Sequence, residues 1–570
     1  MNKKDVIKLL ETIAIYMELK GENTFKIAAY RKAANAIEQD ERPIDEIGDV
    51  TALPGVGKGT ASVIQEYIET ARSTVLEELR AEVPQGLIPL LKLQGLGGKK
   101  IAKLYQELGV TDLLSLQEAC EAGKVKGLPG FGEKSEQKIL QAVRDAGTRP
   151  ERLPIAFMLE IAEQIEAQLA NMIDVVSYSR AGSLRRMRET IKDLDFIIST
   201  EKPESIKEQL LRINGIKDII ASGNTKVSLT LDYDYEVSVD FRIVEPKAFA
   251  TTLHHFTGSK DHNVKMRQLA KERGLKISEY GVENNETGEV ITFQSEEEFF
   301  QFFNRTFIPP ELREGEHEVE LFQDEIPLIK QRDIRGDLHM HSTWSDGAHT
   351  IEQMAKACIA KGYSYMAITD HSKYLRVANG LNVEQLKRQR EEIQRLNEQF
   401  EHFTILTGVE MDILPDGTLD YDDEFLEEMD LVIASIHSSF TQDQETIMKR
   451  LKTAFDSFHV DIIAHPTGRI IGSRDGYDVD MDLLIQLAKE TNTALELNAN
   501  PHRLDLASQY IQKAQDAGVK IVINTDAHHI NQLDYMEIGI SSARKGWIRK
   551  ENVINTLELH QLKKFLSRHH

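Results

Sequence analysis

The sequence predicts a multidomain protein of the α+β and α/β classes, in which a helical region precedes a mixed sheet and then a distorted β/α barrel. With 570 residues the chain is too long for a single hydrophobic core. Residues 1–150 contain helical patterns separated by short glycine turns, whereas residues 151–245 mix helical patterns with β-rich runs. From Gly336 onward, short apolar β-like runs alternate with helices, which is typical of a β/α barrel.

Changes in these patterns predict five domains and a linker. We expect the linker where charged residues are dense and large apolar residues are few, beside an acidic stretch at 311–320. The expected divisions are 1–83 and 84–150 for two helical parts, 151–245 for the sheet, 246–315 for a small lobe, 316–333 for the linker and 334–570 for the barrel.

The composition, 41% hydrophobic and 28% charged, is typical of a globular protein of the cytoplasm. No run of about 18 apolar residues is present, so we expect no membrane span. The two cysteines, Cys120 and Cys358, are expected to be reduced core thiols. The net charge is −23, but residues 1–150 hold 21 Lys and Arg against 22 Asp and Glu. This balance argues against indiscriminate coating of nucleic acid and leaves a locally basic groove open.

Three segments in the first 150 residues share one pattern, in which a Gly-apolar-Gly turn precedes an amphipathic helix. They are LPGVGKGTASVIQEYI (53–68), LQGLGGKKIAKLYQEL (93–108) and LPGFGEKSEQKILQAV (128–143). The alternative is an ordinary tight turn, which three repeats make less attractive. Amides at such a helix start can bind a phosphate of the nucleic-acid backbone without recognising base sequence. The segments resemble helix-hairpin-helix motifs, which implies DNA binding, often with a monovalent cation, by Gly55, Gly57, Gly95, Gly97, Gly130 and Gly132.

A carboxylate pattern follows at 182–240. In a strand, Asp193 and Asp195 point to the same face, and Asp240 lies on a second β-like run. Three carboxylates that hold two Mg²⁺ or Mn²⁺ ions suit phosphoryl transfer to a 3′-hydroxyl. The alternative is a solvated sheet edge that happens to carry two aspartates.

Gly182-Ser183 upstream and HFTGSKDHNVKMRQLA (255–270) downstream favour the first interpretation. Together with the aspartates they resemble family X DNA polymerases over about residues 1–315. The resemblance implies a nucleotidyltransferase palm at 151–245, a small thumb that selects dNTPs, and metal binding by Asp193, Asp195 and Asp240. It further implies nucleotide contacts from Gly182, Ser183, Arg186, Phe256, Gly258 and Asn263, and a template contact from Arg267.

The chain departs from this family at three positions. Val63 stands where the family has its Schiff-base lysine, so we expect no 5′-deoxyribose phosphate lyase activity by that route. His255 replaces a common Tyr beside Phe256, which bears on sugar discrimination. Lys192 precedes the first metal aspartate where Gly is usual, so the local phosphate contact differs.

The last third of the chain is rich in histidines and carboxylates at the ends of β-like runs. A lone histidine at such a place is usually structural, but the number here argues for a site. Six histidines and three carboxylates suit Mn²⁺ or Zn²⁺, and two or three such ions can hydrolyse a phosphodiester. The candidate ligands are His339, His341, Asp346, His371, Glu410, His437, His465, Asp526 and His528.

This set resembles the PHP (polymerase and histidinol phosphatase) family over residues 334–570. All the family ligand positions that can be identified are filled, so we expect a catalytic domain. The resulting hypothesis is a monomeric polymerase for gapped or nicked DNA with a 3′-5′ exonuclease or AP endonuclease activity. Three alternatives are a polymerase with a structural PHP domain, a non-enzymatic scaffold that binds gaps, and a template-independent terminal transferase.

Overall fold

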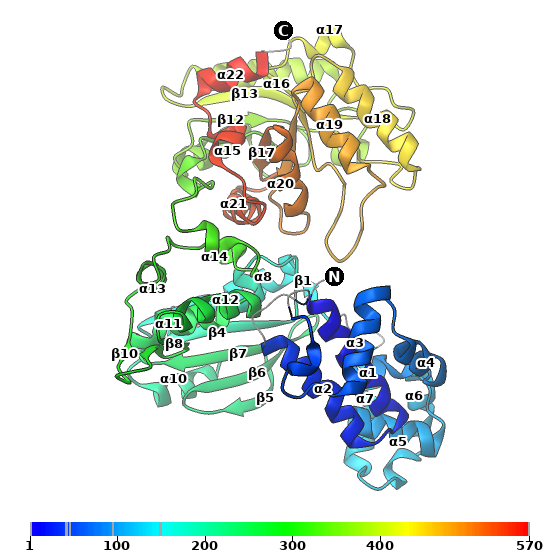
Figure 1. The fold of residues 1–570 in the computed structure, drawn as a ribbon. Helices are drawn as coiled ribbons and strands as arrows, with labels where there is room; N and C mark the ends of the chain where they lie inside the picture. The colour runs from blue at the N-terminus through cyan, green and yellow to red at the C-terminus, as the bar shows by residue number, and fades with distance from the viewer. Residues whose placement is uncertain (1–2, 40–43, 45–46, 94–95, 147–150, 568–570) are drawn as a thin grey trace. The chain divides into compact units, whose positions relative to one another are not determined.

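The computed structural model describes residues 3–39, 44, 47–93, 96–146 and 151–567. The chain forms two compact units, residues 1–150 and residues 151–570 (Figure 1). No helix in the described part of the chain is both long and apolar enough to cross a membrane.

The described residues of the first unit are helical and contain no strand. Leu9 and Ile13 of the first helix and Ile101 and Leu104 of the fifth belong to one buried cluster. The helices are α1 (Lys3–Lys20), α2 (Thr24–Gln39), α3 (Lys58–Thr70), α4 (Thr74–Glu82), α5 (Gly98–Leu108), α6 (Leu113–Glu121) and α7 (Glu133–Ala146). Short 3₁₀ turns, η1 (Val50–Ala52), η3 (Pro89–Lys92) and η4 (Val125–Gly127), precede α3, α5 and α7.

The second unit begins with a five-stranded sheet in the order β2-β4-β7-β6-β5. The pair β4 and β7 is parallel, and the other neighbours are antiparallel. Phe196 of β4 and Phe241 of β7 stack in the core, with ring centroids 5.6 Å apart. The elements are α8 (Ile155–Leu169), β2 (Ser177–Arg180), α9 (Gly182–Arg185), β4 (Asp193–Ser199), α10 (Pro203–Leu210), β5 (Ile216–Ser222), β6 (Lys226–Asp232) and β7 (Glu236–Val244), besides the antiparallel pair β1 (Leu153–Pro154) and β3 (Thr190–Ile191).

A small lobe follows, built on a cluster of buried phenylalanines. Phe299, Phe300 and Phe303 pack edge to face, which is a favoured geometry for aromatic rings. The elements are α11 (Phe249–Thr257), α12 (Lys260–Lys271), β8 (Leu275–Ser278), β9 (Gly281–Asn284), β10 (Val290–Ile291), α13 (Glu296–Phe302) and α14 (Glu318–Leu321).

The remaining residues form seven parallel strands in sequence order, from β11 to β17. Met340, just after β11, forms a parallel bridge with Ala527, just after β17, so the sheet nearly closes into the predicted barrel. The strands are β11 (Gly336–Asp337), β12 (Tyr365–Ile368), β13 (Thr404–Asp412), β14 (Leu431–Ser435), β15 (Ile462–Ile463), β16 (Ala494–Asn498) and β17 (Ile521–Asn524). The helices are α15 (Ile351–Ala360), α16 (Val383–Asn397), α17 (Asp423–Leu426), α18 (Gln444–Asp456), α19 (Met481–Thr491), α20 (Ser508–Ala517), α21 (Tyr535–Lys545) and α22 (Leu559–Leu566).

The barrel and the five-stranded sheet share a packed junction inside the second unit. Leu504 of the barrel is buried in the same cluster as α8, and Ile471 and Ile538 pack against that cluster. The Arg469 guanidinium forms two hydrogen bonds with the Glu189 carboxylate, at 3.1 and 2.8 Å. A bidentate arginine–carboxylate pair beside an apolar contact fixes orientation as well as distance.

Residues 316–333, which the sequence predicts to be a linker, are packed onto the small lobe. Val319, Phe322 and Leu328 are buried in its phenylalanine cluster. The Ile329 amide donates to the Ile548 carbonyl of the barrel at 3.1 Å. The density of charge was misleading here because Glu318 is itself buried, where it accepts a hydrogen bond at 2.8 Å from the ring of His262.

Replacing Phe322 with Ala should therefore lower the free energy of unfolding of the second unit by about 3 kcal/mol, because a buried ring leaves a cavity. The neighbouring Leu321 is 52% exposed, and Leu321→Ala should change that energy by less than about 0.5 kcal/mol. Chemical denaturation of the full chain measures both. Equal, small effects would mean that the segment is not part of the folded lobe.

Candidate functional site

The three aspartates lie on β4 and β7, two neighbouring strands in the interior of the five-stranded sheet. Asp193 and Asp195 alternate along β4, and Asp195 stands opposite Asp240 of β7. Burial, together with the charges of Asp193 and Asp240, raises the pKa of Asp195 to about 7. Carboxylates in this arrangement repel one another, so the site favours a bound cation.

Asp240 has two further partners on the neighbouring strand β6. The Ser228 hydroxyl donates to Oδ1 at 2.6 Å, and Nζ of Lys226 lies 2.7 Å from Oδ2. Sequence patterns had not assigned either residue a role. Ser228 stands directly opposite Asp240, and Lys226, two residues earlier on the same strand, is its diagonal neighbour. Both side chains are therefore within reach of the carboxylate.

Gly182 allows the chain to turn beside these carboxylates. Its φ is +60°, and a Cβ atom at this position would overlap Oδ2 of Asp195. Glycine is therefore required both for the backbone conformation and for the close approach. Ser183 follows in the first turn of α9, and Arg186 ends that helix.

Arg186 connects the sheet to the small lobe. Its Nη1 atom donates to the Thr257 carbonyl, and a Cβ atom on Gly258 would lie 3.3 Å from it. Phe256 lies under the guanidinium of Arg242, 4.6 Å from the ring centroid. The predicted nucleotide contacts Arg186, Phe256 and Gly258 thus come from two lobes that touch here.

Asn263 and Arg267 lie on α12 of the same lobe. The Asn263 amide nitrogen donates to the His255 carbonyl at 2.7 Å. Its Oδ1 atom is buried and makes no hydrogen bond with any residue that the structure describes. Arg267 is exposed, one helical turn further along.

The three hairpins of the first unit share one backbone arrangement. In each, the amide between the two glycines donates to a leucine carbonyl three residues back: Val56 to Leu53 at 3.1 Å, Leu96 to Leu93 at 3.2 Å and Phe131 to Leu128 at 3.0 Å. Gly57 and Gly97 directly precede α3 and α5, and Gly132 precedes α7. Gly55 and Gly130 have φ of +100° and +91°, which favours glycine.

Gly55, Gly57, Gly97, Gly130 and Gly132 are all exposed. Gly95 lies outside the residues that the structure describes. The first and third hairpins therefore present the start of a helix to solvent, where its first amides can face an anion, whereas Gly98 at the start of α5 is buried against the side chain of Glu18. Val63, at the position of the family's lysine, is a buried core residue of the same unit.

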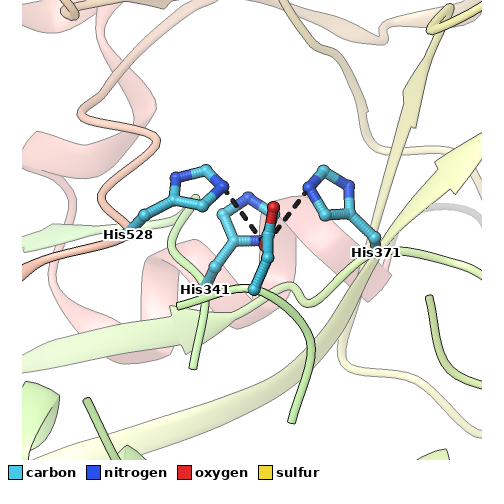
Figure 2. Close-up of side chains that lie close together, drawn as sticks. His341, His371 and His528 are labelled. Carbon is cyan, nitrogen blue, oxygen red and sulfur yellow. Dashed lines mark ion pairs between the residues drawn. The ribbon is translucent and has the colours of Figure 1, made fainter. Parts of the chain in front are cut away.

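The nine predicted metal ligands of the barrel converge at the carboxyl ends of its strands. Three groups can each hold an ion, with their ligand atoms within 4.8 Å of one another. The first contains Asp346 and three histidines, two of which, His371 and His528, lie 3.6 and 3.3 Å from its carboxylate (Figure 2). The three groups are His341, Asp346, His371 and His528; His339, His341, Glu410 and Asp526; and His371, Glu410 and His437.

Glu410 of β13 is shared by the second and third groups. Its Oε1 atom lies 3.1 Å from Nε2 of His437 and 2.9 Å from Nε2 of His465, which brings the ninth ligand to the cluster. Its Oε2 atom lies 2.9 Å from Nδ1 of His371 and 3.3 Å from Nε2 of His339. One carboxylate in contact with so many imidazoles is suited to bridge two cations.

A second layer of carboxylates orients the histidines. Glu496 of β16 lies 2.7 Å from Nδ1 of His339, and Asp412 lies 3.2 Å from Nδ1 of His437. Asn498 donates to Asp526 at 3.0 Å. Outer partners of this kind fix the ring and raise its affinity for metal. Patterns had missed Glu496 and Asp412, although each lies two residues from a polar neighbour of the site on its own strand.

The donor atoms fit a metal. Among the described residues, Nε2 of His339, Nδ1 of His341, Nδ1 of His371 and Oε2 of Glu410 are buried without a hydrogen bond. Burial, with the charges of His528 and His371, lowers the pKa of His341 to about 3, so this ring is neutral and able to bind a metal. For Glu410, burial acts to raise the pKa, but the surrounding histidines hold it well below the usual value. Burial opposes it, but the charge of Glu410 in turn raises the pKa of His437 to about 10. A metal would therefore displace a proton at His437, because neutral imidazoles and ionised carboxylates are the forms that coordinate cations.

Several protein families match segments of this chain. A family described as a helix-hairpin-helix domain matches residues 1–73, and one described as a SAM-like helix-hairpin-helix tandem matches residues 87–145. The DNA polymerase beta thumb matches residues 252–314. The PHP domain matches residues 337–500.

Relatives cover both the whole chain and its parts. The DNA polymerase/3′-5′ exonuclease PolX of Bacillus subtilis (strain 168) is 63% identical over 568 residues, which is 100% of both chains. A probable phosphatase of Thermoanaerobacter sp. (strain X514) is 27% identical over 247 residues, 40% of this chain and 93% of its own. DNA polymerase lambda of Rattus norvegicus is 22% identical over 335 residues, 54% of this chain and 56% of its own.

Glu410→Gln should weaken Mn²⁺ binding by about 100-fold or more, since this carboxylate contributes to two of the three groups. The affinity of the parent protein should fall as the pH is lowered, because the imidazoles must be neutral to bind. Equilibrium dialysis followed by elemental analysis measures both effects. The matched control is His502→Ala, an exposed histidine of the same barrel, which should bind Mn²⁺ like the parent.

Valine at Gly57 and Gly132 should weaken DNA binding about tenfold for each hairpin, because it blocks the approach of a phosphate to the helix start. A Cβ atom meets nothing within 4 Å at either position, so the fold should be retained. Fluorescence anisotropy with a gapped duplex gives the Kd. Ala81→Val, on the exposed face of α4, is the control, and unchanged affinity in the glycine variants would contradict phosphate binding by these turns.

Proposed function

Because the chain belongs to the PolX family of DNA polymerase/3′-5′ exonucleases, we propose that it fills short gaps in DNA during repair and shortens DNA 3′ ends. The polymerase would occupy residues 1–315 and the nuclease the barrel, residues 334–570. Gapped or nicked DNA and dNTPs are then its substrates. The observation that carries the proposal is that one compact unit contains both the three aspartates on the paired strands β4 and β7 and the histidine-rich cluster of the barrel.

In the polymerase site, Asp193, Asp195 and Asp240 would hold Mg²⁺ or Mn²⁺. The ions lower the pKa of the primer hydroxyl and neutralise the leaving pyrophosphate when bound. Asp240 lies on β7, where Lys226 and Ser228 orient its carboxylate. The register that pairs Asp195 with Asp240 supports this assignment.

The proposed nucleotide contacts lie where the five-stranded sheet and the small lobe meet. Ser183, beside Gly182, and Arg186 would bind the triphosphate, and Phe256 with Gly258 would pack on the sugar. The unpaired Oδ1 atom of Asn263 supports a contact with the incoming base. Arg267, exposed on the same helix, would bind the template strand.

In the barrel, the nine ligands would hold two or three Mn²⁺ or Zn²⁺ ions. Such ions supply a hydroxide nucleophile and stabilise the departing oxygen. Glu496 and Asp412 would keep His339 and His437 in the orientation that binding requires. The activity that we propose for this site is a 3′-5′ exonuclease. The same hydrolysis of a phosphodiester would also cleave DNA at abasic sites.

Two alternatives are less well supported. A purely structural barrel would not need four buried donor atoms without hydrogen bonds. A non-enzymatic scaffold would not need a cluster in which burial and the charges of Asp193 and Asp240 raise the pKa of Asp195 to about 7. The hairpins, with a monovalent cation on their loop carbonyls, would grip the DNA backbone in any of these cases.

The buried free thiols Cys120 and Cys358 support a reducing compartment, and we place the protein in the cytoplasm, acting as a monomer. Val63 stands where the family has its Schiff-base lysine, and a buried valine offers no amine. This difference supports the absence of lyase chemistry at that position.

Separate variants should abolish the two activities independently. Asp193→Ala should reduce dNTP incorporation on a gapped duplex by about 100-fold or more, because the site loses a metal ligand. The double variant His339→Ala with His341→Ala should lose 3′-end shortening in Mn²⁺ to a similar extent and retain most synthesis. Gel analysis of a labelled primer with and without dNTPs measures both activities.

Thermal melting of each variant distinguishes lost chemistry from lost fold. Nuclease activity that persists in the double histidine variant would remove the barrel from this role. A barrel that acts only as a support predicts instead that the double variant loses synthesis and melts earlier.

A further inference from the structure

The carboxyl end of α21, in the barrel, contacts the short segment 311–314 of the small lobe. Two consecutive basic residues of α21 hold two carboxylates of that segment. The Arg544 guanidinium donates to Glu311 at 2.5 Å, and Nζ of Lys545 donates to Oε1 of Glu314 at 2.8 Å. The acidic stretch that the sequence suggested as the edge of a linker is thus a contact with the barrel.

Lys545 uses all of its donor capacity at this contact. Besides Glu314, its ammonium donates to the carbonyl of Glu311 at 3.3 Å and to the carbonyl of Arg186 at 3.1 Å. An ammonium group has three hydrogens, so each has an acceptor. The barrel therefore touches the backbone of Arg186 directly, and it touches the side chain of Arg186 through Glu314.

Glu314 lies between Lys545 and Arg186. Its Oε1 atom is 3.6 Å from Nε of Arg186 and 3.7 Å from Nη1 of Arg188, farther than the 2.8 Å to Lys545. The side chains of Lys545, Arg186 and Glu314 are 16, 15 and 25% exposed, so solvent screens these charges only in part. Nε of Arg186 is buried and has no hydrogen bond to any residue that the structure describes.

The same segment also reaches the residue before Arg186. Arg313 is fully buried and pairs with Glu296 at 2.5 Å. Glu296 in turn pairs with Arg185 at 2.6 Å. Segment 311–314 thus supports Arg185 on its inner side and Arg186 on the side that faces the barrel.

We propose that Lys545 of the barrel is a positioning residue for Arg186, holding Glu314 away from the arginine so that its guanidinium is available to the triphosphate. This inference rests on the proposed function, in which Arg186 binds the nucleotide. It assigns the barrel a part in synthesis that does not depend on the barrel's metal site.

The direction of the effect follows from charge competition. When Lys545 pairs with Glu314, the charge of that carboxylate is balanced by the ammonium group. The guanidinium of Arg186 is then left unpaired on this side and can bind an anionic ligand. Without Lys545, the cations left near Glu314 among the described residues are Arg186 and Arg188. Glu314 would then form a closer pair with Arg186 and compete with the triphosphate.

An adhesive role alone would give a different pattern. If Lys545 only joined the barrel to the lobe, Glu314→Gln alone would break the same contact and raise the Kd of the dNTP as Lys545→Met does. If Lys545 acts by occupying Glu314, removing the carboxylate abolishes the competition and restores nucleotide binding. The Kd of Glu314→Gln alone, raised in the first case and close to that of the parent protein in the second, therefore separates the two roles.

The test measures the Kd of the correct dNTP with Mg²⁺ on a gapped duplex whose primer ends in a dideoxynucleotide, so that no chemistry occurs. The full-length variants are Lys545→Met, Glu314→Gln and their combination. Lys361→Met is the matched control, because Lys361 pairs with Asp534 within the barrel at 2.5 Å and is 26% exposed. Exonuclease activity in Mn²⁺ and melting temperature report the integrity of each variant.

Lys545→Met should raise the Kd of the dNTP about tenfold, the scale at which a supporting partner affects a ligand site. Glu314→Gln alone and the combination of the two substitutions should both keep the Kd within about twofold of that of the parent protein, because no carboxylate remains to compete for Arg186. Exonuclease activity and the Kd of Lys361→Met should match the parent protein. If Lys545→Met itself fails to fold, Lys545→Gln, which keeps two donors without the charge, replaces it with the same expected pattern.

The positioning role would be overturned by an unchanged dNTP Kd in Lys545→Met, by a Kd that Glu314→Gln alone raises to a similar extent, or by an equal rise in the Glu314→Gln background. Failure of the parent protein to bind dNTP on gapped DNA would instead refute the proposed polymerase. The two failures are distinct because the second affects every variant alike.

Discussion

A buried or half-buried carboxylate is stabilised by a cation close by, and four such carboxylates organise the second unit. Glu410 lies among histidines of the barrel, and Asp195 lies between two other aspartates. Glu296 lies between Arg185 and Arg313, and Glu314 lies beside Lys545. Fixed side chains satisfy the last two, which hold the lobes together. The first two are satisfied best by mobile cations, and these are the places where we propose chemistry.

Local patterns were enough to predict the class of fold and the side chains that come together at the strand ends of the barrel. The runs YMAIT, FTILTGVEM, LVIASIH, DIIAHP, ALELNAN and VKIVINTD coincide with strands β12 to β17. Because parallel strands present their carboxyl ends at one face of a barrel, residues that follow them are bound to converge. The same reasoning on period-two alternation placed Asp193 and Asp195 on one face of β4.

The partners of these residues could not be predicted in the same way, because they depend on which strands are neighbours. Glu496 reaches His339 across the barrel, and Lys226 reaches Asp240 only through the pairing of β6 with β7. Composition misled at 316–333, where charge suggested exposure. The actual segment buries Phe322 and pairs Glu318 with His262. A count of charged residues does not show which of them form pairs. A charged side chain such as Glu318 can be buried only when it is paired.

The distribution of charge bears on how such an acidic chain could hold DNA. The net charge is −23, yet residues 1–150, which carry the three hairpins, are nearly balanced. Backbone amides at helix starts attract phosphate through aligned dipoles and need no excess of lysine. Some of the carboxylates of the second unit face inward, toward proposed metal ions or toward arginines of the junction. Part of the negative charge is therefore balanced inside the molecule. The surface that contacts DNA need not be negatively charged, although the net charge of the chain is negative.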